Sequence, residues 1–276
     1  MRERADLHIH STASDGAQSP AEIVREAAAA GLGAISIVDH DTVDGLSEAE
    51  ESAEHASVHC VPGVEINTDF GKTEIHIIGY YIDADNRALR EGLQRLRERR
   101  LERAAKIVSR LQELGVPVKL ERVLEIAGRG SVGRPHIAHA ICETGRTDGM
   151  NSAFGKYLVR GAPAFVPRSR MAPPEAIGLI VGAGGVACLA HPGKIGSDLI
   201  VSQLLKAGLQ AMEIYHTDHS TDVCRRYSRL AREYGLIETG GSDSHGMRTE
   251  KPVPIGSVTV GLEVVEQLRR AAGSRC

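Results

Sequence analysis

The stretch DLHIHSTASDG, residues 6–16, indicates both the fold class and the chemistry of this chain. Residues 5–10 read as a strand, and the period of two places His8 and His10 on the same side of it. A helix is expected next, over residues 20–30. Polar side chains thus lie between a strand and a helix, which is the order expected in an α/β fold.

The same alternation of short apolar strands and helices continues on both sides of one interruption. Before residue 83, strands are expected at 34–39, 58–61, 64–67 and 74–82, and a helix is expected at 46–56. After residue 173, strands are expected at 186–190, 211–215, 236–239 and 258–260, and helices at 221–234 and 262–272. About seven of these strands, with helices between them, predict a (β/α) barrel, in which parallel strands end at one common face.

The segment that interrupts this alternation has the sequence pattern of several helices and no convincing strand. It begins with one long charged helix at 87–114 and continues with helical segments at 120–127, 135–144 and 151–158. We therefore expect an α/β fold with a barrel formed by residues 1–83 and 165–276, and a helical insertion over residues 84–164.

Charge is unevenly distributed along the 276 residues, although the formal net charge is only −3. Residues 1–70 contain 14 Asp and Glu against three Lys and Arg, whereas residues 85–170 contain nine against 18. This pattern suggests that the first segment binds cations and the second attracts an anionic ligand, with two solvated surfaces as the alternative. With three Phe, six Tyr and no Trp, the chain is poorly suited to reading bases by aromatic stacking.

The sequence gives no sign of export or membrane insertion. Its start lacks an apolar signal region, and its longest apolar stretch, residues 176–190, is shorter than a spanning helix. The five cysteines are scattered and form no CxxC pair, which is typical of a reducing compartment. We expect a cytoplasmic protein without a membrane association or an obligate protein partner.

Most of the expected strands end in or are followed by His, Asp or Glu. These candidate ligands are His8, His10, Asp15, His40, Glu65, His76, His191, Asp243 and His245. Because the ends of parallel barrel strands converge, we expect these residues to meet. One such residue alone is more often a cap or an ordinary polar contact, but burying the whole set without a cation would be costly. Imidazoles and carboxylates without thiolates favour Zn²⁺, Mn²⁺ or Fe²⁺, and one bridging carboxylate would let the set hold three ions.

In this order, the segments DLHIH, SDG, VDHD, GVE, HIIG, AHP and GSDSH resemble the motifs of the PHP (polymerase and histidinol phosphatase) family. The resemblance implies a distorted seven-stranded (β/α) barrel with a metal centre. SVGRPHIAHAI and FGKYLVRG in the insertion, and GAGGVACLAHPG after it, are similar to the small PHP phosphoesterases. Members of that subgroup hydrolyse nucleoside 3′,5′-bisphosphates, and some degrade RNA from its 5′ end.

The resemblance also implies how the ligands are shared among two or three divalent ions, with Mn²⁺ favoured and Zn²⁺, Fe²⁺ or Mg²⁺ as alternatives. The implied sets are His8, His10, Glu65 and Asp243 for one ion, Glu65, His76 and His191 for another, and Asp15, His40 and His245 for the third. The residues expected to be catalytic are Asp15, His40, Glu65, Asp243 and His245. The expected reaction is attack of a metal-bound hydroxide on the 5′-phosphate side of a nucleoside 3′,5′-bisphosphate or a short RNA.

Basic residues of the insertion are candidates for holding a second phosphate. Arg134 and His136 in GRPH are expected to form one part of this clamp, because a guanidinium group binds phosphate bidentately. Lys156 and Arg160 in GKYLVRG are expected to form the other part. His219 is a further candidate for contact with substrate.

The five arginines within residues 95–103 receive a different interpretation. Glutamates are interleaved with them along the same expected helix, and such i,i+4 pairs stabilise a helix surface. We therefore expect a solvated helix face there, with an RNA-binding track as the less favoured alternative.

Three other functions remain open. A histidinol-phosphate or other small-molecule phosphatase could use the same centre, although the basic insertion favours a substrate with two phosphates. A non-catalytic PHP module attached to a polymerase would be expected to lack ligands. A deaminase or peptidase of the amidohydrolase type would also begin with HxH, but it usually needs a strand-borne lysine, and no lysine lies on an expected ligand-bearing strand end.

Overall fold

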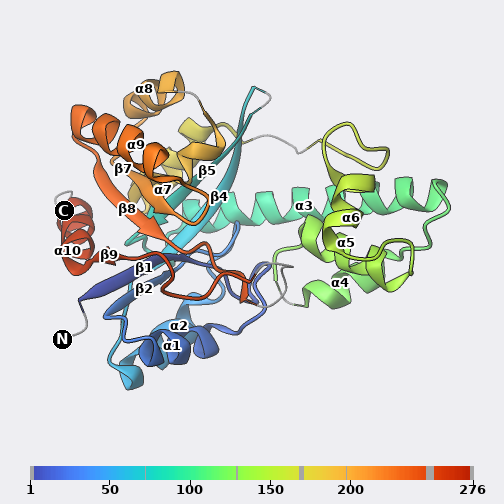
Figure 1. The fold of residues 1–276 in the computed structure, drawn as a ribbon, viewed down its shortest axis with the longest axis horizontal. Helices are drawn as coiled ribbons and strands as arrows, with labels where there is room; N and C mark the ends of the chain where they lie inside the picture. Colours follow the sequence, from blue (N-terminus) through green and yellow to red (C-terminus); the bar gives the residue numbers. More distant parts are fainter. Residues whose placement is uncertain are drawn as a thin grey trace.

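The computed structural model describes residues 3–71, 73–128, 130–167, 171–196, 198–246 and 252–273. The chain forms one part built around two sheets and one helical part, and the long helix α3 (Arg87–Glu113) runs from the first into the second (Figure 1). Among the described residues, no helix combines the length and the apolar character needed to cross a membrane.

The strands and helices lie close to their expected positions. The strands are β1 (Arg4–Ile9), β2 (Ala34–Ile37), β3 (His59–Cys60), β4 (Gly63–Phe70), β5 (Thr73–Tyr80), β6 (Val186–Leu189), β7 (Ala211–His216), β8 (Ile237–Gly241) and β9 (Val260–Gly261). The remaining helices are α1 (Pro20–Ala29), α2 (Leu46–Ala56), α4 (Leu120–Ala127), α5 (Arg134–Glu143), α6 (Met150–Ala153), α7 (Pro173–Gly182), α8 (Asp198–Lys206), α9 (Thr221–Tyr234) and α10 (Leu262–Gly273). Two short helical turns, η1 (Phe154–Leu158) and η2 (Pro192–Lys194), complete the described elements. The expected alternation of strands and helices is confirmed, with the ends shifted by a few residues.

The strands form two sheets, with the orders β3-β2-β1-β9 and β4-β5-β6-β7-β8. Backbone hydrogen bonds join the two sheets: Asp41 N donates to Glu65 O at 2.9 Å, and His10 N donates to Ser244 O at 2.9 Å. The expectation of parallel strands throughout is wrong, because β5 is antiparallel to β4 and β6, and β9 is antiparallel to β1. Residues 71–72 alone connect β4 to β5, and so short a connection allows only an antiparallel hairpin. The fold is therefore mixed α/β.

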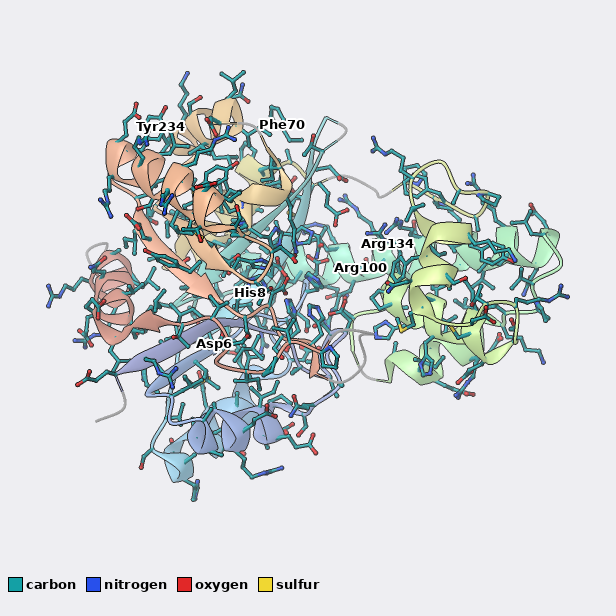
Figure 2. The ribbon with its side chains drawn as sticks, viewed as in Figure 1. Asp6, His8, Phe70, Arg100, Arg134 and Tyr234 are labelled. Carbon is teal, nitrogen blue, oxygen red and sulfur yellow. The ribbon has the colours of Figure 1, made fainter. Side chains whose placement is uncertain are left out.

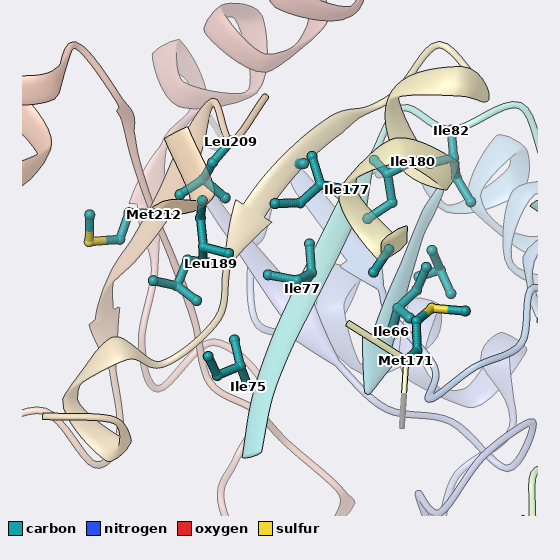
Figure 3. Close-up of a cluster of buried hydrophobic side chains, with 14 of the residues drawn as sticks. Ile66, Ile75, Ile77, Ile82, Met171, Ile177, Ile180, Leu189, Leu209 and Met212 are labelled. Carbon is teal, nitrogen blue, oxygen red and sulfur yellow. The ribbon is translucent and has the colours of Figure 1, made fainter. Parts of the chain in front are cut away.

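Branched aliphatic side chains build the core of the sheet-containing part, as the low aromatic content predicts. Ile75 and Ile77 of β5 are fully buried in one cluster with Ile177 and Ile180 of α7 (Figure 3). Each such side chain contributes on the order of 1.5–3 kcal/mol relative to an exposed one. Because side chains alternate along a strand, His76 between the two isoleucines points away from this core, towards the opposite face of the sheet.

Helix α3 takes part in two separate cores. Its first half contributes Leu89 and Leu93 to the core beneath the sheets. Its second half contributes Ile107 and Leu111 to a cluster formed with α4, α5 and η1. The helical part thus has apolar packing of its own, and α3 connects it to the sheet-containing part.

Candidate metal centre

The candidate ligands gather at one end of the sheets. His8 lies on β1, and the others lie within or just after β1, β2, β4, β5, β6 and β8. Two of them depart from the expectation that ligands end their strands: Glu65 is the third residue of β4 and His76 the fourth of β5. Strand β4 continues past the end of β2, and β5 returns antiparallel to it with His76 opposite Asn67. The side chains of Glu65 and His76 therefore lie beside the ligands that follow the ends of the other strands.

The carboxylate of Glu65 lies at the centre of the group. Its Oε1 is 2.8 Å from Nδ1 of His76 and 3.2 Å from Nε2 of His191. Its Oε2 is 2.9 Å from Nδ1 of His40 and 3.3 Å from Nε2 of His10. Oε2 is buried and has no hydrogen bond of normal geometry within the described residues, so its lone pairs are free for an ion. One carboxylate among four imidazoles is suited to bridging two cations.

His8, His10 and Asp243 converge on a second point. The two Nε2 atoms are 3.1 Å apart, and Oδ1 of Asp243 is 3.3 Å from Nε2 of His8 and 3.2 Å from Nε2 of His10. Ring nitrogens that face each other and a carboxylate oxygen at this distance can all direct their lone pairs at one cation. A donor set of imidazoles and a carboxylate without thiolates fits Zn²⁺, Mn²⁺ or Fe²⁺.

A third group of donors forms around Asp15. Its Oδ1 is 3.3 Å from Nε2 of His245, and ligand atoms of His10 and His40 lie within 4.8 Å of both residues. The three groups of donors share His10 and lie side by side, so the site can hold more than one ion.

Asp39, just beyond β2, stabilises the loop that carries Asp15 through hydrogen bonds. Its carboxylate accepts a hydrogen bond from the backbone N of Ser11 at 2.7 Å and bonds from the hydroxyls of Ser11 and Ser14. Asp39 is 3% exposed, so these bonds hold the loop in a water-poor environment. The position of Asp15 is therefore set by a residue outside the ligand group.

Protons and carboxylate charge balance each other in the metal-free protein. Burial by itself lowers the pKa of His10, but the nearby carboxylates of Asp243 and Glu65 outweigh it and raise the pKa to about 10. Burial also lowers the pKa of His76, and the charge of Glu65 raises it to about 9. Burial would raise the pKa of the Glu65 and Asp243 carboxyls, yet the surrounding histidines hold both well below the usual range. Both carboxylates are therefore ionised at neutral pH, as metal ligation requires.

Two adjoining cavities open onto the ligands. The first has a volume of about 390 Å³ and is lined by candidate ligands together with Thr73, Glu74 and Lys194. The second has a volume of about 170 Å³ and shares His40, Glu74 and His76 with the first. The basic residues that line the second cavity are Arg100, Arg103 and Arg134. Figure 2 shows Arg100 and Arg134 between the sheet-containing part and the helical part. A ligand-lined cavity thus adjoins a basic one.

Of the expected phosphate clamp, the structure brings Arg134 to the cavities. Arg134 begins α5, and its Nη2 lies 3.7 Å from Oε2 of Glu74. Its guanidinium carbon lies 6.0 Å from the centre of the Phe154 ring, which also lines the second cavity. Lys156 and Arg160 are exposed and line neither of the two cavities described above.

The two histidines expected to touch substrate are engaged by the backbone. His136 is 2% exposed, and its Nδ1 accepts a hydrogen bond from Gly133 N at 3.0 Å, so it caps the start of α5. His219 donates from Nδ1 to Ile214 O at 2.8 Å and accepts at Nε2 from Gly193 N at 3.1 Å. Both ring nitrogens of His219 are therefore engaged, one by the backbone of β7 and the other by the backbone of η2.

The prediction of a solvated face for the arginine-rich segment is wrong for Arg100. Its side chain is 15% exposed and donates from Nε to the buried carboxylate of Asp41. Arg100 lies four residues from both Leu96 and Ala104, which are buried, so helical periodicity could have placed it on the inward face. Arg103 also turns inward and donates from Nε to Val166 O at 2.8 Å.

His216 was not among the candidate residues named from the sequence, yet it lies against the candidate ligands. It is 4% exposed, and its Nε2 is 3.1 Å from Oδ2 of Asp243. Its position at the end of β7 is the same signal that identified the other strand-end histidines. Lys194, in η2, is a second such residue: its Nζ lies 3.5 Å from Oδ2 of Asp243 and 3.0 Å from Oδ2 of Asp218.

Residues 6–121 match the family model of the PHP domain. The chain is 35% identical over 246 residues to a 3′,5′-nucleoside bisphosphate phosphatase of Chromobacterium violaceum, covering 87% of this chain and 86% of the relative. It is also 35% identical over 247 residues to the 5′-3′ exoribonuclease Rnm of Escherichia coli, covering 87% and 84%. A solved structure from Bifidobacterium adolescentis, assigned to the metal-dependent phosphoesterases, matches with a TM-score of 0.90 at 29% identity, covering 97% of this chain and 96% of that one.

Proposed function

This chain belongs to the PHP domain family, and from that premise we propose that it is a metal-dependent phosphoesterase acting on the 5′-phosphate side of nucleoside 3′,5′-bisphosphates. The same site would release mononucleotides one at a time from the 5′ end of short RNA. Relatives that are 35% identical over most of the chain carry these two activities in their names.

One observation carries the proposal: the ligand-lined cavity and the arginine-lined cavity adjoin each other. They share His40, Glu74 and His76, so a bound molecule can occupy both at once. Two phosphates a ribose apart would place one at the ligands and the other near Arg134, where a guanidinium can bind it bidentately. A monophosphate would use only the first cavity, and this difference predicts the substrate preference.

The candidate ligands divide among two or three ions as the family resemblance implies. His8, His10 and Asp243 with Glu65 would hold one ion, Glu65 with His76 and His191 would hold a second, and Asp15, His40 and His245 would hold a third. Distances of 2.8–3.6 Å between the donor atoms of neighbouring ligands support this division. Mn²⁺ is the favoured ion, with Zn²⁺, Fe²⁺ or Mg²⁺ as alternatives, because the donors are imidazoles and carboxylates only.

The residues of the chain would bind, orient and shield the substrate. Bound divalent ions supply an activated water and stabilise charge on the phosphoryl oxygens. Arg134 holds the second phosphate in the basic cavity, and Arg103 adds positive charge there. Asp15, His40, Glu65, Asp243 and His245 would hold the ions that bind the reacting phosphate.

The architecture proposed for this function is a closed barrel with an insertion. Hydrogen bonds that link β1 to Ser244 and β4 to Asp41 support closure of the two sheets into a distorted barrel of seven strands. The separate apolar cluster shared by α3, α4, α5 and η1 supports residues 84–164 as an insertion into a barrel formed by residues 1–83 and 165–276.

A comparison of substrates on Mn²⁺-loaded protein tests the proposed function. Phosphate and nucleotide release would be measured for adenosine 3′,5′-bisphosphate, AMP, a short 5′-phosphorylated RNA and histidinol phosphate under identical conditions. We expect a much higher kcat/KM for the bisphosphate than for AMP, and release of 5′-terminal mononucleotides from the RNA. Equal values for the bisphosphate and AMP, or a preference for histidinol phosphate, would favour a general small-molecule phosphatase instead.

A further inference from the structure

Glu213 of β7 is a buried carboxylate outside the candidate ligand set. It is 0% exposed, and each of its two oxygens accepts a hydrogen bond from a residue of that set. Oε1 lies 2.9 Å from Nδ1 of His8, and Oε2 accepts from the backbone N of His191 at 2.8 Å. Two candidate ligands on different strands are therefore held by one side chain.

The first contact determines which nitrogen of His8 carries the proton. An ionised carboxylate can only accept, so Nδ1 of His8 must be the donor. Nε2 is then unprotonated in the neutral ring, and it is the atom that lies 3.1 Å from Nε2 of His10 and 3.3 Å from Asp243. Only this tautomer offers a lone pair at the point where the donors converge.

The second contact holds an unusual backbone. His191 has φ 29° and ψ 58°, a left-handed conformation that non-glycine residues adopt at a cost. The bond from its N–H to Glu213 secures one side of this turn, and the Tyr227 hydroxyl donates to Pro192 O at 2.9 Å on the other. The turn directs Nε2 of His191 to 3.2 Å from Oε1 of Glu65.

We propose that Glu213 is a positioning residue that prepares His8 and His191 together for metal binding. The inference rests on the metal centre of the proposed function. It depends on the carboxylate offering two acceptors, because both partners donate to it. A glutamine at this position has one acceptor and one donor, so it must either lose the His191 bond or impose the opposite tautomer on His8.

Glu213→Gln therefore tests the proposal without a change in side-chain size. We expect its Mn²⁺ affinity, measured by equilibrium dialysis of the otherwise intact protein, to be about 10- to 100-fold weaker than that of wild type. The matched control is Glu238→Gln on the neighbouring strand β8, since Glu238 contacts Ser228 and Arg232 but none of the candidate ligands. The control should bind Mn²⁺ like wild type.

The outcomes separate this inference from the proposed function. Equal Mn²⁺ affinity in Glu213→Gln and wild type would overturn the role of Glu213 and leave the metal centre standing. Absence of Mn²⁺ binding by wild type itself would overturn the metal centre and the inference with it.

A second measurement locates the proton in the wild-type chain, where a variant serves only to assign the resonance. In zinc-loaded protein labelled with ¹⁵N-histidine, we expect the His8 ring to carry its proton on Nδ1, with the resonance assigned by comparison with His8→Asn. A proton on Nε2 of His8 in that spectrum would contradict the proposal. In Glu213→Asp, which keeps both acceptors, the proton should remain on Nδ1.

Discussion

Arg100 of α3 and Asp41, just beyond β2, form a buried ion pair that ties the helical part of the chain to the candidate metal centre. Asp41 also accepts a hydrogen bond from Asn67 N at 2.9 Å, and Nδ2 of Asn67 lies 3.1 Å from Nδ1 of His40. The ion pair is thus connected to the candidate ligand His40 through Asn67. A movement of α3 would therefore shift the position of His40.

Replacing Arg100 should destabilise the fold strongly. Arg100→Met leaves the Asp41 carboxylate, 2% exposed, without its counter-ion, and breaking a buried pair in this way costs about 3–5 kcal/mol. The control is Arg97→Met on the same helix, which breaks an exposed pair with Asp44 and should cost about 1 kcal/mol or less. Urea unfolding of both variants gives the comparison, and equal losses would contradict the buried pairing.

Replacing Arg134 should weaken substrate capture without affecting the metals. Arg134→Ala removes one charge-assisted phosphate contact, worth roughly 1.5–3 kcal/mol, so kcat/KM for adenosine 3′,5′-bisphosphate should fall about 10- to 150-fold. Metal content should not change, because Arg134 is not a candidate ligand. Lys156→Ala is the control, since Lys156 is exposed and outside the two cavities, and it should retain nearly full activity. Full activity of Arg134→Ala would place the second phosphate elsewhere.

The central position of Glu65 predicts a difference between two ligand variants. Glu65→Gln should weaken two ion sites together, because its two oxygens face His76 and His191 on one side and His40 and His10 on the other. His245→Ala should mainly weaken the site near Asp15. Elemental analysis after reconstitution with Mn²⁺ would give the number of ions per chain in each variant and in wild type. Fewer than two ions per wild-type chain would rule out the three-ion arrangement.

The stability of the metal-free protein should fall as the pH rises above neutrality. The pKa values of His10 and His76, about 10 and about 9 in the folded chain, lie above the ordinary value of 6.5. The folded state therefore binds more protons than the unfolded state between about pH 6.5 and 9, and stability decreases through that window. Below about pH 6.5 this contribution is fully present.

Divalent ions should reverse the effect of pH on stability. They compete with the protons on the same ring nitrogens, so the stabilisation by Mn²⁺ should grow from about pH 6.5 to about pH 8.5. Urea midpoints measured with EDTA and with Mn²⁺ at both pH values test this expectation. A Mn²⁺ effect that is largest at the lower pH would argue against ligation by these histidines.

The ligand group could be predicted from the sequence because each member lies within or soon after an apolar segment that is recognisable as a strand. Local alternation places His8 and His10 on one side of β1, and the topology of the fold then brings distant strands to one end. The antiparallel direction of β5 was not predicted from the sequence. It depends on the short turn after β4 and on a pairing with β6, which follows about a hundred residues later.

The basic cavity was harder to predict than the ligands. Which arginines face the basic cavity depends on the angle at which α3 and α5 pack. The charge pattern along one helix does not determine that angle. Arg100 was therefore expected in solvent although it is buried, whereas Lys156 was expected at the site although it is exposed. Glu213 was missed because its partners, His8 and His191, are fixed by tertiary contacts far away in the chain.

The antiparallel pairing of β5 with β6 has a consequence for synthesis on the ribosome. Residues 81–185 separate the two strands, so β5 is made long before its neighbour and presents an open edge in the meantime. The helical cluster within that interval is built from contacts close in sequence and can fold first. Its early folding would shorten the flexible chain that must be closed to deliver β6, lowering the entropic cost of the step. Variants that unfold the helical part should therefore aggregate during expression even where every strand is intact.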